Sequence, residues 1–584
     1  MAGKFTALSG AGLMLAAVAG SASQSASAQS LGYGSVSGAD GGSGGGSAAA
    51  GSDGAGVSGP HDSSGKLPGG GHSGKRERLK ITPYIEALQV ISADLSPGDA
   101  VLTWSALAAG VDGNFQGRRS EGTFSVRYEH GFGWGRAEDR DVISGLARGG
   151  VTIVPQAVSL EAGALATRTS VDVNGASLPG SFDQNRSTHL YSLYAGPNLS
   201  THAGDVAVTG TYRIGYTEVG SNQLVAQNAQ LSNVDVFDHS VTHNAELHAG
   251  TRAGEILPVG LGAGVGYYQE DVSNLDQQVK DFHARLDATL PVSGTVALVG
   301  GIGYEDVTVS SRDVLRDASG APVIGSDGRW VTDGGAPRQI AYDTSGFIWD
   351  AGVTWRPSRR TALEAHVGRR YGSTTYYGSF GWRATRRSSV NISVYDNIAG
   401  FGGQFGTALA ELPRDFDVLR DPVSGDVISC VSSLEQGSCL TSAFGAVRSA
   451  VFRARGVQAS YALQVGRFGT GIAAGYDRRK FIAAPGTILA GANGRIDENT
   501  WLSAWFNGRI DRDSSFSTTI YADWYRTDFI ADGDGTALGA TATYGRAFGQ
   551  HISANAAISI QGIQRRQVDD YWNASAVLGV RYSF

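Results

Sequence analysis

The end of the chain alternates regularly between two kinds of residue. Every even position from 572 onward is apolar: Trp572, Ala574, Ala576, Leu578, Val580, Tyr582 and Phe584. The odd positions between them are mostly polar or small. Because successive side chains of a strand point to opposite faces, this pattern predicts a strand with one apolar face. It is long enough for a tilted strand of about 9–11 residues to cross a bilayer.

The same two-residue period recurs upstream. It is clear in the segments 206–217, 282–290 and 347–356, where apolar residues alternate with polar ones that include charges. Charges without partners would be costly in the core of a soluble protein, whereas a water-filled lumen accepts them. The alternation therefore predicts strands with lipid on one side and water on the other.

About 22 such segments follow Leu79, separated by breaks of two classes. Short breaks include 202–204, 290–293, 357–360, 511–513 and 548–550, and long ones include 220–236, 310–343, 399–448 and 483–494. Short and long breaks mostly take turns along the chain, as in bacterial outer-membrane barrels. The predicted fold class is all-β: a transmembrane antiparallel up-and-down β-barrel of about 22 strands (an even number, 18–22) with no plug domain. Residues 79–584 form this barrel, with both termini periplasmic.

The predicted register turns charges of both signs toward the lumen. These are Arg127, Glu129, Arg213, Glu246, Arg252, Arg285, Asp287, Asp350, Arg356, Glu364, Arg370 and Arg581. A ring of one sign would indicate ion selectivity, and this mixture does not. Two interpretations stay open: pairs of charges that stiffen a wet wall, and a translocation path.

Aromatic residues near the ends of the segments predict interfacial girdles. They are Tyr216, Tyr267, Tyr304, Trp349, Trp355, Trp524, Trp572 and Tyr582. Tyr582 and the terminal Phe584 are typical of the signal that the barrel-assembly machinery reads in outer-membrane proteins. Outer-membrane lipid and that machinery are therefore the predicted partners, together with an unknown solute or envelope partner.

The first 78 residues differ from the rest. Residues 1–28 are typical of a secretory signal peptide, with Lys4, an apolar centre at 13–19 and a small-residue cleavage site at 26–28. Residues 29–78 are dominated by Gly, Ser and Ala, which predicts a disordered linker. The sequence has no run of about 18 apolar residues, so we expect no helical membrane span. The chain of 584 residues has a net charge of -7, which gives no support for nucleic-acid binding.

Little in the sequence points to catalysis or to metal binding. Cys430 and Cys439 lie in the longest loop of an exported chain, which favours a disulfide. His239 and His243 share a strand face about 13 Å apart at about 3.3 Å per residue, and His248 points the other way. These three cannot share one ion on a strand. We expect no enzyme activity, no cofactor and no metal.

Glycines at 260, 262, 264 and 266 share one face of a segment. A nucleotide-binding glycine loop needs a strand-to-helix turn in a βαβ unit, and that context is missing here. We expect these glycines to form a smooth inner wall or to let a neighbouring side chain or loop approach closely.

Several longer stretches carry a family resemblance. They are 81–86, 117–122, 292–301, 355–361, 367–373 and the ending 581–584. Over residues 79–584 the chain resembles a group of Gram-negative outer-membrane β-barrel proteins, similar to those associated with PEP-CTERM/exosortase and exopolysaccharide systems. Members are often labelled preprotein translocase subunit YajC, a label that does not fit, since that subunit is a small inner-membrane protein with one spanning helix. The resemblance implies fold and location, and carries no catalytic residues.

Two functions follow from the pattern. A closed barrel of 22 strands is about 40 Å across, too wide for wall side chains to fill, so water occupies it or loops fold inward. The first hypothesis is a pore or export conduit for a polar solute, linked by the resemblance to exopolysaccharide. The alternative is a structural or adhesive surface barrel that acts through its loops. A TonB-dependent receptor would need a folded plug of well over a hundred residues before the barrel. Only the predicted disordered linker, residues 29–78, lies between the signal peptide and the barrel, so we do not expect a receptor of this class.

Overall fold

The computed structural model describes residues 78–584 except 172–176, 180–186, 221–222, 228–229, 235–238, 413, 415, 417, 419, 428–429, 432–437, 440–448, 530–532 and 567–568. The predicted signal peptide and nearly all of the predicted linker lie outside these residues. No helix in the described part of the chain is long and apolar enough to cross a membrane.

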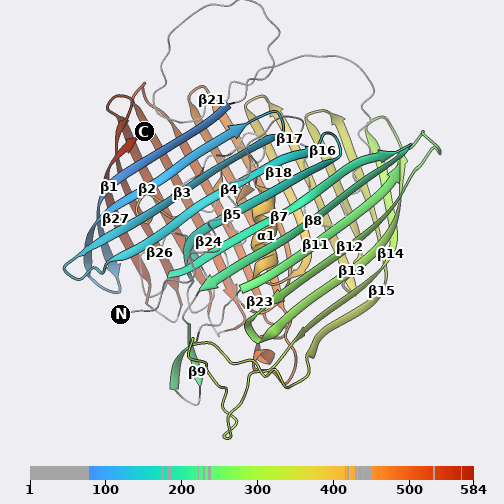
Figure 1. The fold of residues 1–584 in the computed structure, drawn as a ribbon, viewed down its shortest axis with the longest axis horizontal. Helices are drawn as coiled ribbons and strands as arrows, with labels where there is room; N and C mark the ends of the chain where they lie inside the picture. The colour runs from blue at the N-terminus through green and yellow to red at the C-terminus, as the bar shows by residue number, and fades with distance from the viewer. Residues whose placement is uncertain are drawn as a thin grey trace, which may run out of the picture.

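Twenty-two long strands form one closed antiparallel barrel (Figure 1). Each strand pairs with the next along the chain, and β1 closes the ring by pairing with β27 from Tyr84↔Ser583 to Ser96↔Trp572. This is the even, up-and-down arrangement that the alternation predicts. The barrel strands are β1 (Arg78–Ser96), β2 (Val101–Gln116), β3 (Ser120–Trp134), β4 (Arg140–Val154), β5 (Val158–Val171), β7 (Ser187–Ala203), β8 (Val206–Gly220), β11 (His239–Thr251), β12 (Gly260–Val272), β13 (Gln277–Pro291), β14 (Val296–Ser311), β15 (Gln339–Ser358), β16 (Thr361–Arg370), β17 (Ser373–Thr385), β18 (Ser388–Ala399), β21 (Phe452–Val465), β22 (Phe468–Phe481), β23 (Ile496–Arg509), β24 (Ser514–Thr527), β25 (Gly535–Ala547), β26 (Ile552–Arg565) and β27 (Tyr571–Ser583).

The remaining elements are short and belong to connections. They are β6 (Ser177–Pro179), β9 (Gln223–Gln227), β10 (Gln230–Val234), η1 (Asn274–Asp276), α1 (Phe401–Glu411), β19 (Cys430–Val431), β20 (Ser438–Cys439) and η2 (Ile488–Ala492). Short turns join the strands at the end where β1 begins and β27 ends, which we call the terminal end. The long connections lie at the opposite end, the loop end, at the bottom of Figure 1.

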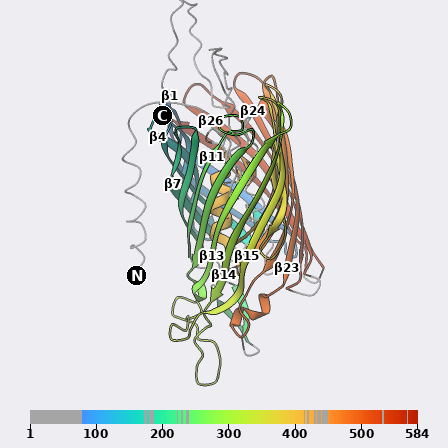
Figure 2. The same cartoon turned by 90° about the vertical axis from the view of Figure 1, so that its right-hand side faces the viewer.

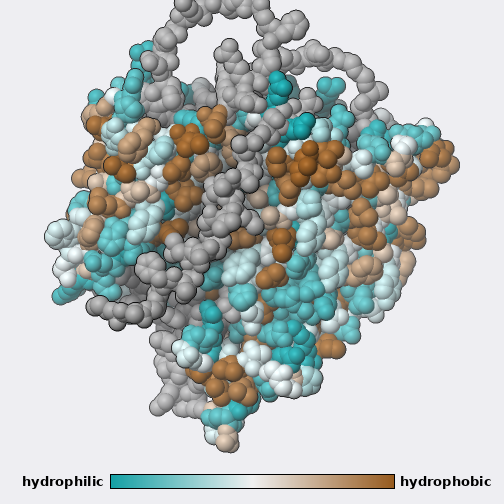
Figure 3. Space-filling model, viewed as in Figure 1, coloured by the Kyte–Doolittle hydropathy of each residue, from teal (hydrophilic) through white to brown (hydrophobic). Residues whose placement is uncertain are grey.

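The outside of the barrel is apolar. In β27 Leu578 is 66% exposed and points outward, whereas its neighbour Val577 is 2% exposed and points inward. Large apolar side chains are exposed on the outer face in the same way around the ring, and Figure 3 shows them on the visible wall. Exposed aromatic residues of the predicted girdles include Trp349, Trp355, Trp524 and Tyr582. Many exposed apolar side chains outside a ring whose interior holds most of the charges fit a barrel that crosses a membrane.

The predicted fold class is wrong in one respect, the absence of a plug. The connection between β18 and β21 does not stay outside the barrel: the described residues of 400–427, which we call the inserted segment, fold into the lumen and begin with α1 (Figure 2). In the described residues the plugging element thus comes from within the barrel sequence. The physical reason is the width of the ring, whose wall side chains cannot fill it.

Candidate functional site

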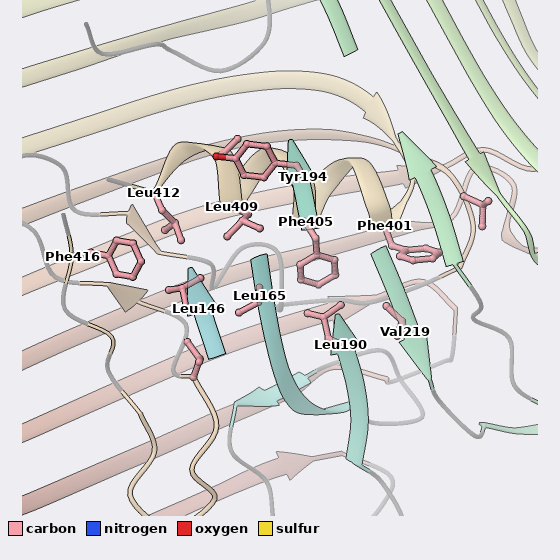
Figure 4. Packing of buried hydrophobic residues seen from close by; sticks show 13 residues of the cluster. Leu146, Leu165, Leu190, Tyr194, Val219, Phe401, Phe405, Leu409, Leu412 and Phe416 are labelled. Atoms are coloured by element: carbon pink, nitrogen blue, oxygen red, sulfur yellow. The ribbon is translucent and has the colours of Figure 1, made fainter. Parts of the chain in front are cut away.

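The lumen and the inserted segment form the candidate site. One part of the inner wall carries apolar side chains that α1 covers. Leu146, Leu165, Leu190 and Val219 of four neighbouring strands pack against the segment, whose contacting residues are Phe401, Phe405, Leu409, Leu412 and Phe416 (Figure 4). Water-facing wall positions would not need these side chains, so this patch is built to hold the segment.

The start of α1 is held by one buried carboxylate. Glu270 of β12 is 0% exposed, and its Oε2 accepts hydrogen bonds from Gly400 N at 2.6 Å and Tyr268 OH at 2.6 Å. Its Oε1 accepts from Gly403 N at 3.1 Å and Ser240 Oγ at 2.7 Å. A negative charge at a helix N-terminus satisfies amides that have no partner within the helix and is favoured by the helix dipole. Glu270 therefore acts as an N-terminal cap supplied by the wall.

Glycines let the helix approach this cap. A Cβ added at Gly403 would clash with the Tyr268 hydroxyl and with Glu270, and one added at Gly402 would clash with Ser240. Gly406, further along α1, would meet nothing within 4 Å. The glycines at 402 and 403 are therefore required by the close contact, whereas the one at 406 is not.

Further along, arginines join the segment to the wall. Arg168 of β5 donates to Asp426 through Nε at 3.2 Å and Nη2 at 3.1 Å. Arg420 donates from Nη1 to Ser144 Oγ at 2.5 Å and from Nη2 to Ser125 Oγ at 2.9 Å. Bonds of this kind with a charged partner are stronger than neutral ones. The segment is thus fixed to strands β3 to β12 by both apolar and ionic contacts, and its Val423 also packs against β1, β2, β26 and β27.

Two carboxyl groups of the segment have shifted titration. Burial raises the pKa of Glu411 to about 8, although the charges of Arg213 and Arg148 oppose this shift. Burial also raises the pKa of Asp421 to about 6, against hydrogen bonds from the Ser424 and Val423 amides. Both groups lie on the segment and not on a spanning strand. Their protonated forms are favoured while the segment is seated.

Most of the predicted lumen charges are paired, some with a residue of the same strand and some across strands. Arg127 meets Glu129 at 2.8 Å, Arg213 meets Glu161 at 2.7 Å, and Arg285 meets Asp350 at 2.7 Å and Asp287 at 3.4 Å. Arg370 meets Asp281 at 2.7 Å, Glu364 meets His366 at 3.3 Å, and Arg581 meets Asp112 at 2.6 Å. Glu246 lies on the inner face of β11, opposite Thr211 of β8. Such pairs fit the wall-stiffening interpretation, and a role in translocation stays a proposal.

Two predicted charges lie elsewhere. Arg252 is not on a strand but in the turn after β11, where its Nη1 lies 3.9 Å from Glu255 Oε1. Arg356 is exposed near the terminal end of β15, beyond the point at which pairing with β16 becomes irregular. Both belong to the rim of the barrel, because the strand ends there and the alternation no longer decides which way a side chain points.

The glycine face of β12 supports two imidazoles. Added Cβ atoms at Gly262 and Gly264 would meet the ring of His248, and one at Gly266 would meet the ring of His283. This is the close approach that the glycine spacing predicts. His248 Nε2 lies 3.0 Å from Asp287 Oδ1, whereas His243 points to the other face and bonds Tyr212 OH at 2.9 Å. Within the described ranges no group of His, Cys, Asp or Glu gathers as metal ligands would.

Cys430 and Cys439 lie directly opposite each other in the short β19–β20 ladder. Their side chains are outside the described residues, so the disulfide stays a prediction.

The sequence did not identify Glu270 or the other wall residues that contact the inserted segment. Glu270 has the same parity as the glycines at 260–266, which was the available signal for its inward direction. The Gly400, Gly402 and Gly403 run was the available signal for a close approach. Neither signal names the partner, since Gly400 and Glu270 are 130 residues apart.

No protein-family model matches the chain, and no curated protein matches it. Among solved structures it is similar to the FrpB iron transporter from Neisseria meningitidis, with 11% identity over 86% of this chain and 82% of that one and a TM-score of 0.41. It is also similar to the siderophore receptor PiuA from Acinetobacter baumannii, with 8% identity, the same two coverages and a TM-score of 0.41. The ferric-catecholate import receptor Fiu from E. coli K12 has 11% identity, covers 86% and 81%, and has a TM-score of 0.41. Similarity at this level carries no argument about function.

The ring is closed, its exterior carries apolar side chains and its interior carries charges, as in β-barrels that cross a membrane. The chain is an outer-membrane β-barrel. The PEP-CTERM and YajC resemblance stays a prediction.

Proposed function

We propose that this outer-membrane barrel is a gated conduit for a polar solute, closed by the inserted segment. The observation that carries the proposal is the Glu270 cap: a carboxylate of the wall holds the first turn of a helix that occupies the lumen. Many of the other inward-facing side chains are charged or polar, beside apolar clusters such as the one at Trp501 and Trp505, and this polar lining suits water and polar solutes. The conduit needs no catalytic group.

The way the segment is attached allows it to move without opening the ring. Ala399, at the end of β18, pairs directly with Phe452, at the start of β21. The segment therefore leaves and re-enters the wall at one point, and the ladder between these strands does not depend on it. A shift of the segment changes the lumen while the barrel keeps its hydrogen bonds.

The same geometry defines the test. Because Ala399 and Phe452 are already neighbours, a short Asn-Gly hairpin can replace residues 400–451. We expect this variant to form larger and longer-lived single-channel openings in planar bilayers than the full chain. Shortening the turn 252–259 at the terminal end is the control and leaves conductance unchanged. If neither the full chain nor the deletion variant conducts under any condition, the proposal of a conduit is wrong.

That negative result would favour the alternative, a surface barrel that acts through its loops. One observation supports it: the connection 312–338 has its own bridges, Val314↔Thr332, Arg316↔Pro322 and Ile324↔Trp330, and forms an ordered projection at the loop end. Binding of intact cells to surfaces, compared with and without this projection, tests that role.

The orientation and partners are part of the proposal. The first strand begins and the last one ends at the terminal end, and we place that end in the periplasm, with the long connections outside. Tyr582 and Phe584 would present the assembly signal there. A link to exopolysaccharide rests on the sequence resemblance alone.

A further inference from the structure

Two neighbouring turns at the terminal end repeat one sequence motif. Residues 355–361, where β15 turns into β16, read Trp-Arg-Pro-Ser-Arg-Arg-Thr. Residues 382–388, where β17 turns into β18, read Trp-Arg-Ala-Thr-Arg-Arg-Ser. Both follow the pattern Trp-Arg-x-Ser/Thr-Arg-Arg-Ser/Thr, and the proposed conduit gives neither of them a role. We call these two stretches the arginine turns.

The two arginine turns are closed by the same hydrogen bonds. Ser358 Oγ lies 3.2 Å from Thr361 Oγ1, and the equivalent Thr385 Oγ1 lies 2.8 Å from Ser388 Oγ. In each turn the first of these hydroxyls also accepts a hydrogen bond from the backbone amide of the second arginine of the Arg-Arg pair. The pairing of the strands becomes irregular just before both turns. The repeat in sequence is therefore also a repeat in structure.

Together the arginine turns form one basic surface. Arg383 N donates to Arg360 O at 2.8 Å, so the two turns are in direct contact. Neither turn contains an acidic residue, and neither do the next turns of the terminal end on each side, 292–295 and 466–467. All six arginines are exposed: Arg356, Arg359, Arg360, Arg383, Arg386 and Arg387. This part of the rim therefore carries a concentrated positive charge.

Other arginines of the terminal end share their turns with acids. Arg252 Nη1 lies 3.9 Å from Glu255 Oε1, and Arg512 stands between Asp511 and Asp513 in the chain. The arginine turns differ because they contain no acid that would balance their charge. A cluster of one sign at a surface attracts a partner of the opposite sign.

Two tryptophans place this charge beside lipid. Trp355 is 38% exposed and Trp382 is 45% exposed, both on the outer face of the barrel. They flank β16, where Trp355 is opposite Leu363 and Trp382 is opposite Thr361. Tryptophan is enriched at membrane–water interfaces, where its ring lies at the level of the lipid headgroups. Because an arginine follows each tryptophan directly, the basic surface lies at the level of the headgroup phosphates.

The chemistry of arginine selects the kind of anion. Its guanidinium group presents N–H donors in a planar fork that fits the oxygens of a phosphate, and it stays charged at every physiological pH. An acidic protein would also be attracted by the charge, but it would gain nothing from tryptophans that face hydrocarbon. The forks and the tryptophans together fit a molecule that has both a phosphate and acyl chains.

We infer that the arginine turns bind an anionic phospholipid of the adjoining leaflet. The arginine pairs 359–360 and 386–387 hold its phosphate, and its acyl chains lie beside the two tryptophans. This site is on the outer rim and not in the lumen, so it does not depend on the proposed conduit. It gives the barrel a preferred lipid neighbour at one point of its circumference.

Lipid binding to the purified barrel tests this inference. In native mass spectrometry from detergent micelles, the full chain should bind phosphatidylglycerol with a Kd at least tenfold lower than that for phosphatidylcholine. Arg359→Gln with Arg360→Gln should weaken phosphatidylglycerol binding at least fivefold. Arg118→Gln with Arg119→Gln removes an equal charge from an exposed turn of the terminal end, and should change binding less than twofold. A full chain without a preference, or an equal loss in both variants, would overturn the inference.

A second variant separates a lipid from a soluble anion. Trp355→Leu with Trp382→Leu keeps every arginine, and it should weaken phosphatidylglycerol binding at least threefold. Unchanged binding in this variant would overturn the assignment to a lipid, because phosphate recognition alone would then be sufficient. Polyglutamate, added to the barrel in phosphatidylcholine nanodiscs, is the probe for an acidic protein. If it binds there and is lost in the Arg359→Gln, Arg360→Gln variant while phosphatidylglycerol shows no preference, the partner is a protein and the inference is wrong.

Discussion

At the scale of single residues, one carboxylate decides where the lumen helix begins. Glu270 accepts four hydrogen bonds without an ion-pair partner in the described part of the chain, and two of its donors are amides at the start of α1. Its charge is compensated by these donors and by the helix dipole. The side chain thus couples a wall strand to the segment, and replacing it should act on the segment before it acts on the barrel.

Glu270→Gln tests this coupling. The amide group places an NH₂ near the donors of Gly400 or Gly403, and losing charged hydrogen bonds of this kind costs about 1–3 kcal/mol. We expect backbone amides of 401–411 to exchange with deuterium roughly 5- to 150-fold faster, with strand amides unchanged. Glu255→Gln, in a turn at the terminal end, is the matched control. Exchange that is equally slow in both variants would contradict the capping role.

Glu411 makes the segment's stability depend on pH. Since burial raises the pKa of Glu411 to about 8, the seated segment holds this proton more tightly than a released one does. Its contribution is therefore full below about pH 4.5 and is lost as pH rises through about 8. We expect faster exchange in 401–411 and more frequent channel opening at pH 8.5 than at pH 5. Glu411→Gln should flatten this dependence, and an unchanged profile would assign it to another group.

At the scale of elements, α1 fits its wall because of where its glycines lie. Gly403→Ala would push a methyl group into the Tyr268 hydroxyl and Glu270. We expect this change to release the start of α1, seen as faster exchange in 401–411. Adding Tyr268→Phe removes the hydroxyl and should restore part of the protection.

The same helix supplies the control. Gly406→Ala adds a methyl group where nothing lies within 4 Å. Because Ala is favoured over Gly in a helix by about 0.5–1 kcal/mol, this change should slow exchange slightly. If both alanine variants behave alike, close packing at 403 is not what positions the helix.

The β19–β20 ladder makes the predicted disulfide geometrically reasonable. Opposite residues of an antiparallel ladder have Cα atoms about 4.5 or 5.5 Å apart, within the range that disulfides span. Protein isolated from the envelope should resist alkylation at Cys430 and Cys439 until it is reduced, as judged by intact mass. Alkylation of both residues without reduction would show free thiols.

At the scale of the whole molecule, the barrel depends on its apolar exterior. Leu578, in the middle of β27, is 66% exposed on the outer face. An arginine there would face hydrocarbon and cost about 2–4 kcal/mol. We expect Leu578→Arg to destabilise the barrel folded in bilayers by this amount, as measured by urea titration of the free energy of unfolding. Leu79→Arg, at the start of β1 before its ladder with β27, should have little effect.

The sequence by itself determined the wall. A two-residue period fixes which side chains face lipid, and the order of short and long breaks fixes an up-and-down ring, because both follow from local backbone geometry. It also predicted which charged side chains point into the lumen. That prediction failed only where strands end, at Arg252 and Arg356. It had no local signal for a partner in the lumen.

Only the tertiary structure decided what fills the ring. Whether the β18–β21 connection lies outside or inside depends on contacts between residues far apart, such as Gly400 with Glu270 and Arg168 with Asp426. The hydrophobic pattern of the sequence does not specify these pairs, because their hydrogen bonds can form only after the ring has closed. The position of the inserted segment inside the lumen is therefore a property of the closed barrel.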